Sequence, residues 1–382
     1  MLCICLSLHK IICMKIGFDA KRALFNHRGL GNYSRDTIRI VAQSHPNDEI
    51  LMFSPKSEPL IPFDYPKNCK IIAPSGFFWK SMPSLWRSSF MYKTINEMDV
   101  DVYHGLSHEL PFGIEKTRVR KVLTMHDLIF VKYPQMFPYF DRKMYNMKYR
   151  HSCDAADHII AVSERTKRDL MECWNIDESR ISVVYQGCNP RYLNVVSEAE
   201  KAEVRRKYNL PEGFVFNIGA IEERKNQVRL IEAVARLKDV PLVIAGRKSK
   251  YQKELENAVM SADVRDRVFI VNDIETDDLP ALYQSAAVFA FPSLFEGFGI
   301  PVLEALHSGL PVVAATGSCL EESGGPGSMY VNPEDVEEIA DAINKVLCDS
   351  ELREKMRVAN AGHLDKFNDE SIARQLNDIY KG

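Results

Sequence analysis

The sequence lacks three features that mark common functional classes. Beyond residues 1–13, no stretch approaches the roughly eighteen apolar residues of a membrane-spanning helix. The net charge is only −3, which gives no electrostatic support for a nucleic-acid partner. None of the nine cysteines is paired at zinc-ligand spacing, and their scatter is typical of reduced, mostly buried thiols in a cytoplasmic protein.

Residues 1–13 are apolar but too short to cross a bilayer. They lack a basic start and a small-residue cleavage site, which argues against a signal peptide. Met14 then opens an apolar run that is typical of a buried first strand. We therefore interpret Met14 as the natural start and residues 1–13 as an extension of the gene model. A short membrane-contacting segment is the alternative.

The sequence does contain a regular alternation of short apolar runs with amphipathic stretches. The first series of runs is 16–18, 50–53, 70–73, 100–104, 121–125, 158–162 and 181–184. The second series is 214–218, 242–245, 268–271, 288–291, 311–314 and 329–331. Short, nearly all-apolar strands joined by helices indicate parallel sheets covered on both faces.

A polar stretch near residues 190–212 separates the two series. We therefore expect an α/β fold of two Rossmann-like, doubly wound parallel-sheet domains that face a cleft. The expected domains are residues 14–195 and 196–366, with a C-terminal helix in 367–382 that packs back on the first domain. Ligands of such sheets bind at the carboxyl ends of the strands, so functional motifs should follow strands.

The most informative motif follows the run 288–291, where two glycines lie close to an acidic residue and precede a helix that carries proline at its start. The helix amino terminus would offer free amides to an anion, at Phe298, Gly299 and Ile300. Glu296 in the loop and Glu304 in the helix could bind hydroxyls at opposite ends of one elongated ligand. A sugar joined through diphosphate to a ribose has that shape. A turn with two solvated glutamates is the alternative.

A second motif, Gly219–Asn226, follows the run 214–218 and precedes another helix. Its adjacent cations, Arg224 and Lys225, have the chemistry to neutralise a diphosphate. An exposed basic turn is the alternative. The two motifs lie at carboxyl ends of strands in one domain, which favours a shared site.

In the N-terminal half, Gly29 and Gly31 are expected in the first strand-to-helix loop. Because glycine has no side chain, the main chain there can approach a phosphate or an acceptor closely. Asn32 and Tyr33 follow directly. The run 50–53 ends without the acidic residue that a dinucleotide site requires, so a nicotinamide dehydrogenase is not expected.

His126 and Asp127 follow the run 121–125, where a histidine can donate to sugar or phosphate oxygens. A structural loop histidine is the alternative. Asp99 and Asp101 form an Asp-x-Asp pair at the wrong end of a strand for a ligand. His104 and His108 lack the glutamate of a metalloprotease motif. We expect no metal and no cofactor.

Two segments combine aromatic and basic residues, at 77–87 and 134–150. Such segments can lie on an anionic membrane surface or bind a lipid-linked acceptor. Packing in the core or in a lid over the acceptor is the alternative.

The two C-terminal motifs resemble those of the retaining glycosyltransferases of family 4, which have the GT-B fold. The likeness extends over nearly the whole chain from Met14 and leans towards mannosyltransferases or similar hexosyltransferases. It implies that Glu296 contacts hydroxyls of the donor sugar and that Glu304 binds the ribose. It also implies that Arg224 and Lys225 neutralise the diphosphate.

The resemblance assigns further residues. It places His126 beside the donor sugar, the main chain of 298–300 along the phosphate and sugar, and the glycine-rich first loop at the cleft. The remaining expectations are donor contacts from Gly219 and Asn272, and acceptor-side positions for Asp127, Asn32 and Tyr33. Ala220 and Asn272 depart from the family pattern, so one phosphate contact and the nucleobase stay open. Glu322 matches a recurrent family glutamate whose role is open.

The resemblance implies transfer of a hexosyl unit, with mannosyl as one candidate, from a nucleoside diphosphate sugar to an acceptor hydroxyl with retention of configuration. The expected acceptor is a glycan or a lipid-linked glycan in polysaccharide assembly, met in the cytoplasm or at the inner membrane surface. Two rivals remain: an epimerase of nucleotide sugars with the same fold, and a non-catalytic subunit that binds nucleotide sugars.

Overall fold

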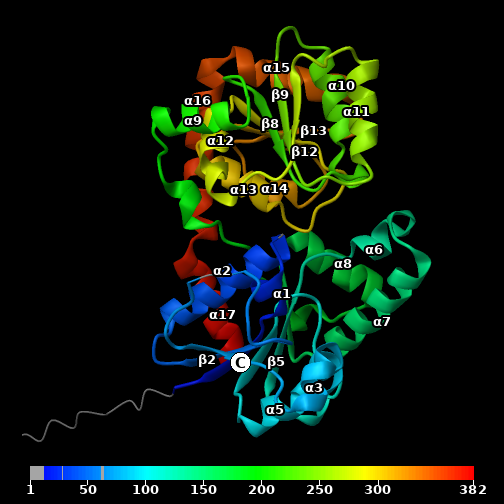
Figure 1. The fold of residues 1–382 in the computed structure, drawn as a ribbon, viewed down its shortest axis with the longest axis vertical. Helices are drawn as coiled ribbons and strands as arrows, with labels where there is room; N and C mark the ends of the chain where they lie inside the picture. Colours follow the sequence, from blue (N-terminus) through cyan, green and yellow to red (C-terminus); the bar gives the residue numbers. More distant parts are fainter. Residues whose placement is uncertain (1–12, 28, 62–63) are drawn as a thin grey trace, which may run out of the picture.

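The computed structural model describes residues 13–27, 29–61 and 64–382. These residues form two α/β halves, each built on one parallel sheet with helices on both faces, and one half lies above the other in Figure 1. The strand orders are β3-β2-β1-β4-β5-β6-β7 in the first sheet and β10-β9-β8-β11-β12-β13 in the second. The expected class, two doubly wound parallel sheets, is confirmed.

The first sheet consists of β1 Lys15–Asp19, β2 Glu49–Phe53, β3 Cys69–Ile72, β4 Val102–Gly105, β5 Arg120–Met125, β6 His158–Ala161 and β7 Ile181–Val183. The second consists of β8 Val215–Ile218, β9 Leu242–Ala245, β10 Val268–Val271, β11 Val288–Phe291, β12 Val312–Ala315 and β13 Met329–Val331. The central strands are buried along their length because helices cover both faces, which explains their nearly all-apolar sequences.

The helices of the first half are α1 Lys21–Phe25, α2 Gly29–Ser44, α3 Phe77–Ser81, α4 Pro83–Leu85, α5 Met91–Glu97, α6 Ile129–Lys132, α7 Tyr139–Ala155 and α8 Glu164–Trp174. They are followed by α9 Glu198–Lys207, α10 Gln227–Ala235, α11 Gln252–Ser261, α12 Leu279–Ser285, α13 Ile300–His307, α14 Leu320–Gly324, α15 Val336–Cys348, α16 Ser350–Ala361 and α17 Asp369–Lys381.

The strand order of each sheet reverses at one place, between β1 and β4 in the first and between β8 and β11 in the second. Side chains that follow strands on both sides of such a switch point can reach a common ligand. Figure 1 shows α13 and α14 of the second half on the side that faces α1, α2 and α8 of the first. The loops after the central strands of the two sheets therefore face one another.

The last helix, α17, returns to the first half and lies beside α2. Arg39 of α2 forms an ion pair with Asp369 at 2.6 Å. Tyr380 packs against the first sheet, where its hydroxyl is 2.8 Å from Nδ1 of the fully buried His104.

The domain limits at residues 195 and 366 stay a proposal. The interpretation of residues 1–13 falls almost entirely outside the described residues.

The Gly29 and Gly31 expectation needs a correction. These residues do not form a loop, because α2 begins at Gly29 and includes Gly31. A Cβ at Gly31 would overlap the main-chain oxygen of Asn26, whereas Gly29 has open space around it. Gly31 therefore permits close packing of α2 against the end of α1.

Among the described residues, no helix has the length and apolar character needed to cross a membrane.

Candidate functional site

Two loops of the second half meet at its switch point. The β8 loop (residues 219–226) and the β11 loop (residues 292–299) follow neighbouring strands of the sheet. Asn226 has a left-handed main chain at φ 57° and donates from Nδ2 to the main-chain oxygen of Pro292 at 3.0 Å. This hydrogen bond therefore joins the two loops that carry Lys225 and Glu296.

The structure brings Glu296 and the two cations of the β8 loop together, in direct ion pairs that the sequence did not predict. Lys225 Nζ lies 2.6 Å and Arg224 Nη1 lies 2.9 Å from Oε1 of Glu296. Burial alone would raise the pKa of Glu296, but Arg224 and Lys225 outweigh it and lower this pKa to about 2. Arg224 is also paired with Glu222 at 2.5 Å, so the cations are engaged by carboxylates. Their contact with a diphosphate stays a prediction.

The amino terminus of α13 has the features that the sequence predicts. Gly299 precedes the helix with φ 105°, and Pro301 occupies its first turn. A Cβ at Gly299 would also press against Leu320 and Ser323, so glycine is required there for two reasons. Phe298 is buried and its ring stacks on Tyr185 of the first half at 5.7 Å. The amides at 298–300 therefore lie between the halves.

Glu304 is buried on α13, one turn beyond these amides. Its Oε2 accepts a hydrogen bond from the hydroxyl of Tyr283 at 2.7 Å. Burial raises the pKa of Glu304 to about 7, although hydrogen bonds from Tyr283 and Tyr192 oppose the rise. The pKa values of Glu296 and Glu304 are thus shifted in opposite directions, and of these two residues only Glu304 titrates near neutral pH.

His126 lies at the carboxyl end of β5 and is 5% exposed. Its Nε2 donates to the main-chain oxygen of Leu106 at 2.9 Å, and its Nδ1 faces the amide of Gln186 at 3.4 Å. Burial and the neighbouring His108 lower the pKa of His126 to about 3, so the ring is neutral. Both ring nitrogens have protein partners, and a direct contact with substrate stays a prediction.

The other predicted acceptor-side residues are dispersed. Asp127 accepts from the amide of Ile129 at 3.1 Å, and its pKa is raised by burial while Arg224 of the other half opposes this. Tyr33 is buried with its ring edge against His126 at 4.6 Å. Asn32 is turned to Arg35 of its own helix at 2.5 Å. Of these residues, Asp127 lies closest to the charged cluster.

Two predicted donor contacts have local roles. Gly219 leaves room for the Lys225 side chain, whose Cε would be 3.2 Å from a Cβ at that position. Asn272 follows β10, two strands from β8, and donates from Nδ2 to the main-chain oxygen of Gly246 at 2.6 Å. Asn272 therefore ties neighbouring loops together at the carboxyl edge of the sheet.

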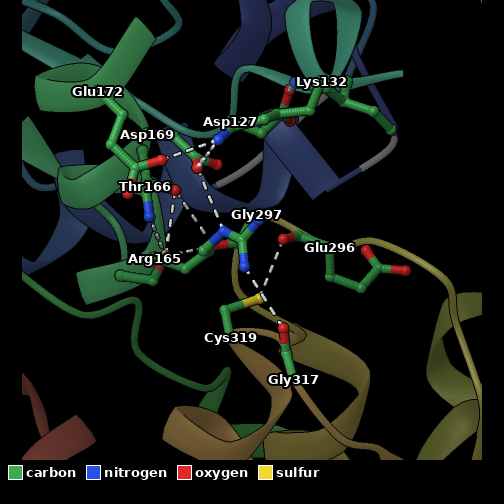
Figure 2. Close-up of polar contacts among 12 residues, drawn as sticks. Asp127, Lys132, Arg165, Thr166, Asp169, Glu172, Glu296, Gly297, Gly317 and Cys319 are labelled. Carbon is green, nitrogen blue, oxygen red and sulfur yellow. Dashed lines mark hydrogen bonds and ion pairs between the residues drawn. The ribbon is translucent and has the colours of Figure 1, made fainter. Parts of the chain in front are cut away.

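Sequence reasoning did not predict that residues of the first half touch the β11 loop. Ser163 Oγ donates to the main-chain oxygen of Gly297 at 2.7 Å, and Thr166 Oγ1 donates to that of His126 at 3.0 Å. Cys319 donates from Sγ to the main-chain oxygen of Glu296 at 3.0 Å, while the Glu296 carboxylate points away from it (Figure 2). The only sequence signal was Ser163 as a helix cap.

Within the described parts of the chain, no group of three His, Cys, Asp or Glu side chains could hold a metal ion. His104 bonds to Tyr380 and to Thr124 Oγ1 at 2.8 Å. His108 Nε2 accepts from the amide of His126 at 3.2 Å. Asp101 lies at the amino end of β4 and accepts from the amide of Lys15 at 2.8 Å. These motifs therefore have structural partners.

Comparisons with known proteins match both halves. The family model Glycosyltransferase Family 4 matches residues 29–192, and the model Glycosyl transferases group 1 matches residues 200–362. The Escherichia coli O-antigen chain mannosyltransferase B is 27% identical over 389 residues, which cover 96% of this chain and 100% of that protein.

Solved structures agree on the fold. Sucrose-phosphate synthase from Thermosynechococcus elongatus superposes with a TM-score of 0.74 at 21% identity, covering 96% of this chain and 98% of that one. Anabaena Alr3699/HepE in complex with UDP and glucose superposes with a TM-score of 0.73 at 19% identity, covering 96% and 99%. The two family matches, one on each sheet, show that this chain belongs to the family 4 glycosyltransferases and transfers glycosyl units.

Proposed function

We propose that this glycosyltransferase moves a mannosyl unit from a nucleoside diphosphate mannose to a hydroxyl of a growing glycan. The observation that supports this most is the buried cluster of Glu296, Lys225 and Arg224 beside the amino terminus of α13. The cluster combines an ionised acceptor for sugar hydroxyls with cations and helix amides for a diphosphate. The mannosyl unit is proposed from the name of the Escherichia coli relative.

In the proposed reaction, the bond between the anomeric carbon and the diphosphate oxygen breaks, and a bond to the acceptor oxygen forms on the same face. The acceptor proton passes to the departing diphosphate oxygen. Arg224, Lys225 and the amides at 298–300 stabilise the charge that develops on the diphosphate. Lys225 and Glu296 are each less than one-tenth exposed, and water-poor surroundings strengthen such contacts.

The test is incubation of the purified chain with a panel of nucleotide sugars, with and without a mannose-terminated oligosaccharide. A nucleoside diphosphate mannose of the panel should raise the melting temperature, and its nucleoside diphosphate should be released only when the acceptor is present. The panel identifies the base, and GDP, the guanosine form, is the nucleotide used in the tests that follow. Formation of an epimer from donor alone would establish the epimerase instead. Binding without any turnover across a broad acceptor panel would establish the non-catalytic subunit.

The pH dependence of nucleotide binding tests the proposed role of Glu304. Its pKa of about 7 leaves the carboxylate mostly ionised at pH 8 and mostly protonated at pH 6. Ribose hydroxyls donate to the ionised form, so the Kd for GDP should rise about tenfold from pH 8 to pH 6. Isothermal titration calorimetry measures this change.

Glu304→Gln is the control for that titration, since it keeps an oxygen for Tyr283 and removes the titrating group. The variant should retain only the pH dependence of GDP itself. Identical pH profiles for the wild type and the variant would rule out a titrating contact between Glu304 and the nucleotide.

We also propose that the first half contacts an anionic membrane, where a lipid-linked acceptor would lie. Large apolar side chains are exposed on α3 and α7, with Phe77 at 89% and Phe140 at 82%. Lys80 and Lys143 are exposed beside them. Arg87 and Lys148 lie 2.8 Å and 4.0 Å from Glu109, which places the two segments side by side.

Sedimentation with lipid vesicles tests this surface. The chain should bind vesicles that contain phosphatidylglycerol more strongly than neutral ones, and salt should weaken the binding. Replacing Phe77 and Phe140 by serine should weaken it about tenfold or more, because two rings that would enter the bilayer are lost. Val358→Ser, at a 60% exposed apolar residue of α16, is the matched control. Equal binding of all three proteins would contradict the proposal.

A further inference from the structure

The amino terminus of α8 joins the two halves beside the site. Ser163 caps this helix by accepting from the amide of Thr166 at 3.0 Å. The amides of Glu164 and Arg165 remain for other partners, because the first amides of a helix have none within it. Both bind the carboxylate of Glu322, which belongs to α14 of the other half, at 2.7 and 3.0 Å.

A carboxylate is well matched to this position. The amino end of a helix bears partial positive charge, and a carboxylate oxygen that accepts from its amides is held by charge as well as by hydrogen bonding. Each oxygen of Glu322 takes one amide, so the contact is bidentate.

The same helix end holds both segments of the site. The hydroxyl of Ser163 donates to Gly297 in the loop that contains Glu296, and the hydroxyl of Thr166 donates to the main-chain oxygen of His126. A Cβ at Gly297 would overlap that His126 oxygen, so the segments are in direct contact. Figure 2 shows Thr166 and Gly297 joined, with Arg165 reaching Gly317 of the other half.

We propose that Glu322 is a positioning residue: by binding the amino end of α8 it sets the first half, with His126, against the loop that contains Glu296. Donor-binding groups proposed for this enzyme lie largely on the second half. The contact of Glu322 therefore affects the alignment of the two halves and not the grip on the nucleotide. The catalytic part of this inference rests on the proposed function.

Hydrogen exchange tests the contact itself without any assay of activity. In Glu322→Ala, the amides of Glu164 and Arg165 should exchange about tenfold faster than in the wild type, because their acceptors are gone. Glu321→Ala is the matched control. Its carboxylate accepts from Thr316 Oγ1 at 2.6 Å and from the Gly317 amide at 2.9 Å, within its own half. That variant should leave both α8 amides unchanged.

Steady-state kinetics and calorimetry then test positioning. Glu322→Ala should lower kcat about tenfold and leave the Kd for GDP unchanged, whereas a role in donor binding would raise the Kd. Glu322→Gln keeps one acceptor oxygen and should give an intermediate kcat. If Glu322→Ala does not fold, as circular dichroism would show, Glu322→Gln and Ser163→Ala provide the same two readouts.

Three outcomes overturn the inference: unchanged exchange at Glu164 and Arg165, equal changes in Glu321→Ala, or faster exchange with an unchanged kcat. Failure of the proposed function gives a different result. In that case the wild type would show no transfer from any nucleotide sugar, while the exchange difference between the Glu322 and Glu321 variants would remain.

Discussion

Replacement of Glu296 by glutamine should lower kcat about 10²- to 10³-fold, the effect typical of removing one preorganised electrostatic contact to a transition state. The carboxylate is held ionised by Arg224 and Lys225, with its pKa lowered to about 2, so it is a full charge at every working pH. Glutamine keeps the shape and removes that charge. Single-turnover measurement of transfer from GDP-mannose gives the change.

The same variant should bind GDP as tightly as the wild type or more tightly. Removal of an anion beside two cations leaves more positive potential for a diphosphate. The opposed directions of kcat and affinity separate a catalytic contact from general damage to the site. Glu223→Gln is the control, since this exposed carboxylate lies in the same cationic loop. Unchanged turnover in Glu296→Gln would remove Glu296 from the mechanism.

Replacement of Lys225 by methionine should weaken GDP binding about 10- to 100-fold, which corresponds to the loss of one charge-assisted hydrogen bond. The side chain is 9% exposed, and methionine fills a similar volume. Arg224 stays 2.9 Å from Glu296, so the buried carboxylate keeps a partner and the fold should survive. Calorimetry with GDP measures the change in affinity.

Lys238→Met is the matched control for this prediction, because Lys238 is exposed beyond the far end of α10. A fall in turnover with an unchanged Kd for GDP would mean that Lys225 serves only to hold Glu296. An unchanged Kd together with normal turnover would remove Lys225 from the site altogether.

The strands and the C-terminal motifs could be predicted because local patterns determine them. Runs such as 242–245 and 268–271 coincide with β9 and β10, since buried parallel strands need unbroken apolar sequence. The position of Pro301 fixes the start of α13 through the geometry of proline itself. Glu296 and Lys225 each follow a strand of the second series, which favours a shared site, but the adjacency of β8 and β11 is known only from the structure.

Other features depend on residues that are distant in sequence, and local patterns do not contain them. Glycine at position 31 looks like a loop signal, but it is required by the oxygen of Asn26 against which the helix packs. The pairing of Arg224 with Glu222 and Glu296 could not be read from a basic turn. Likewise, the binding of Glu322 to α8 joins residues 157 and 158 positions apart.

The place of Tyr380 has a consequence for how the protein is made. Tyr380 lies in the last turn of α17. Its hydroxyl bonds to His104 of the first sheet, and His104 bonds in turn to Thr124. A ribosome completes all seven strands of that sheet long before it reaches Tyr380. The half that is synthesised first therefore acquires α17, the last helix that packs on it, only after the second half has been made.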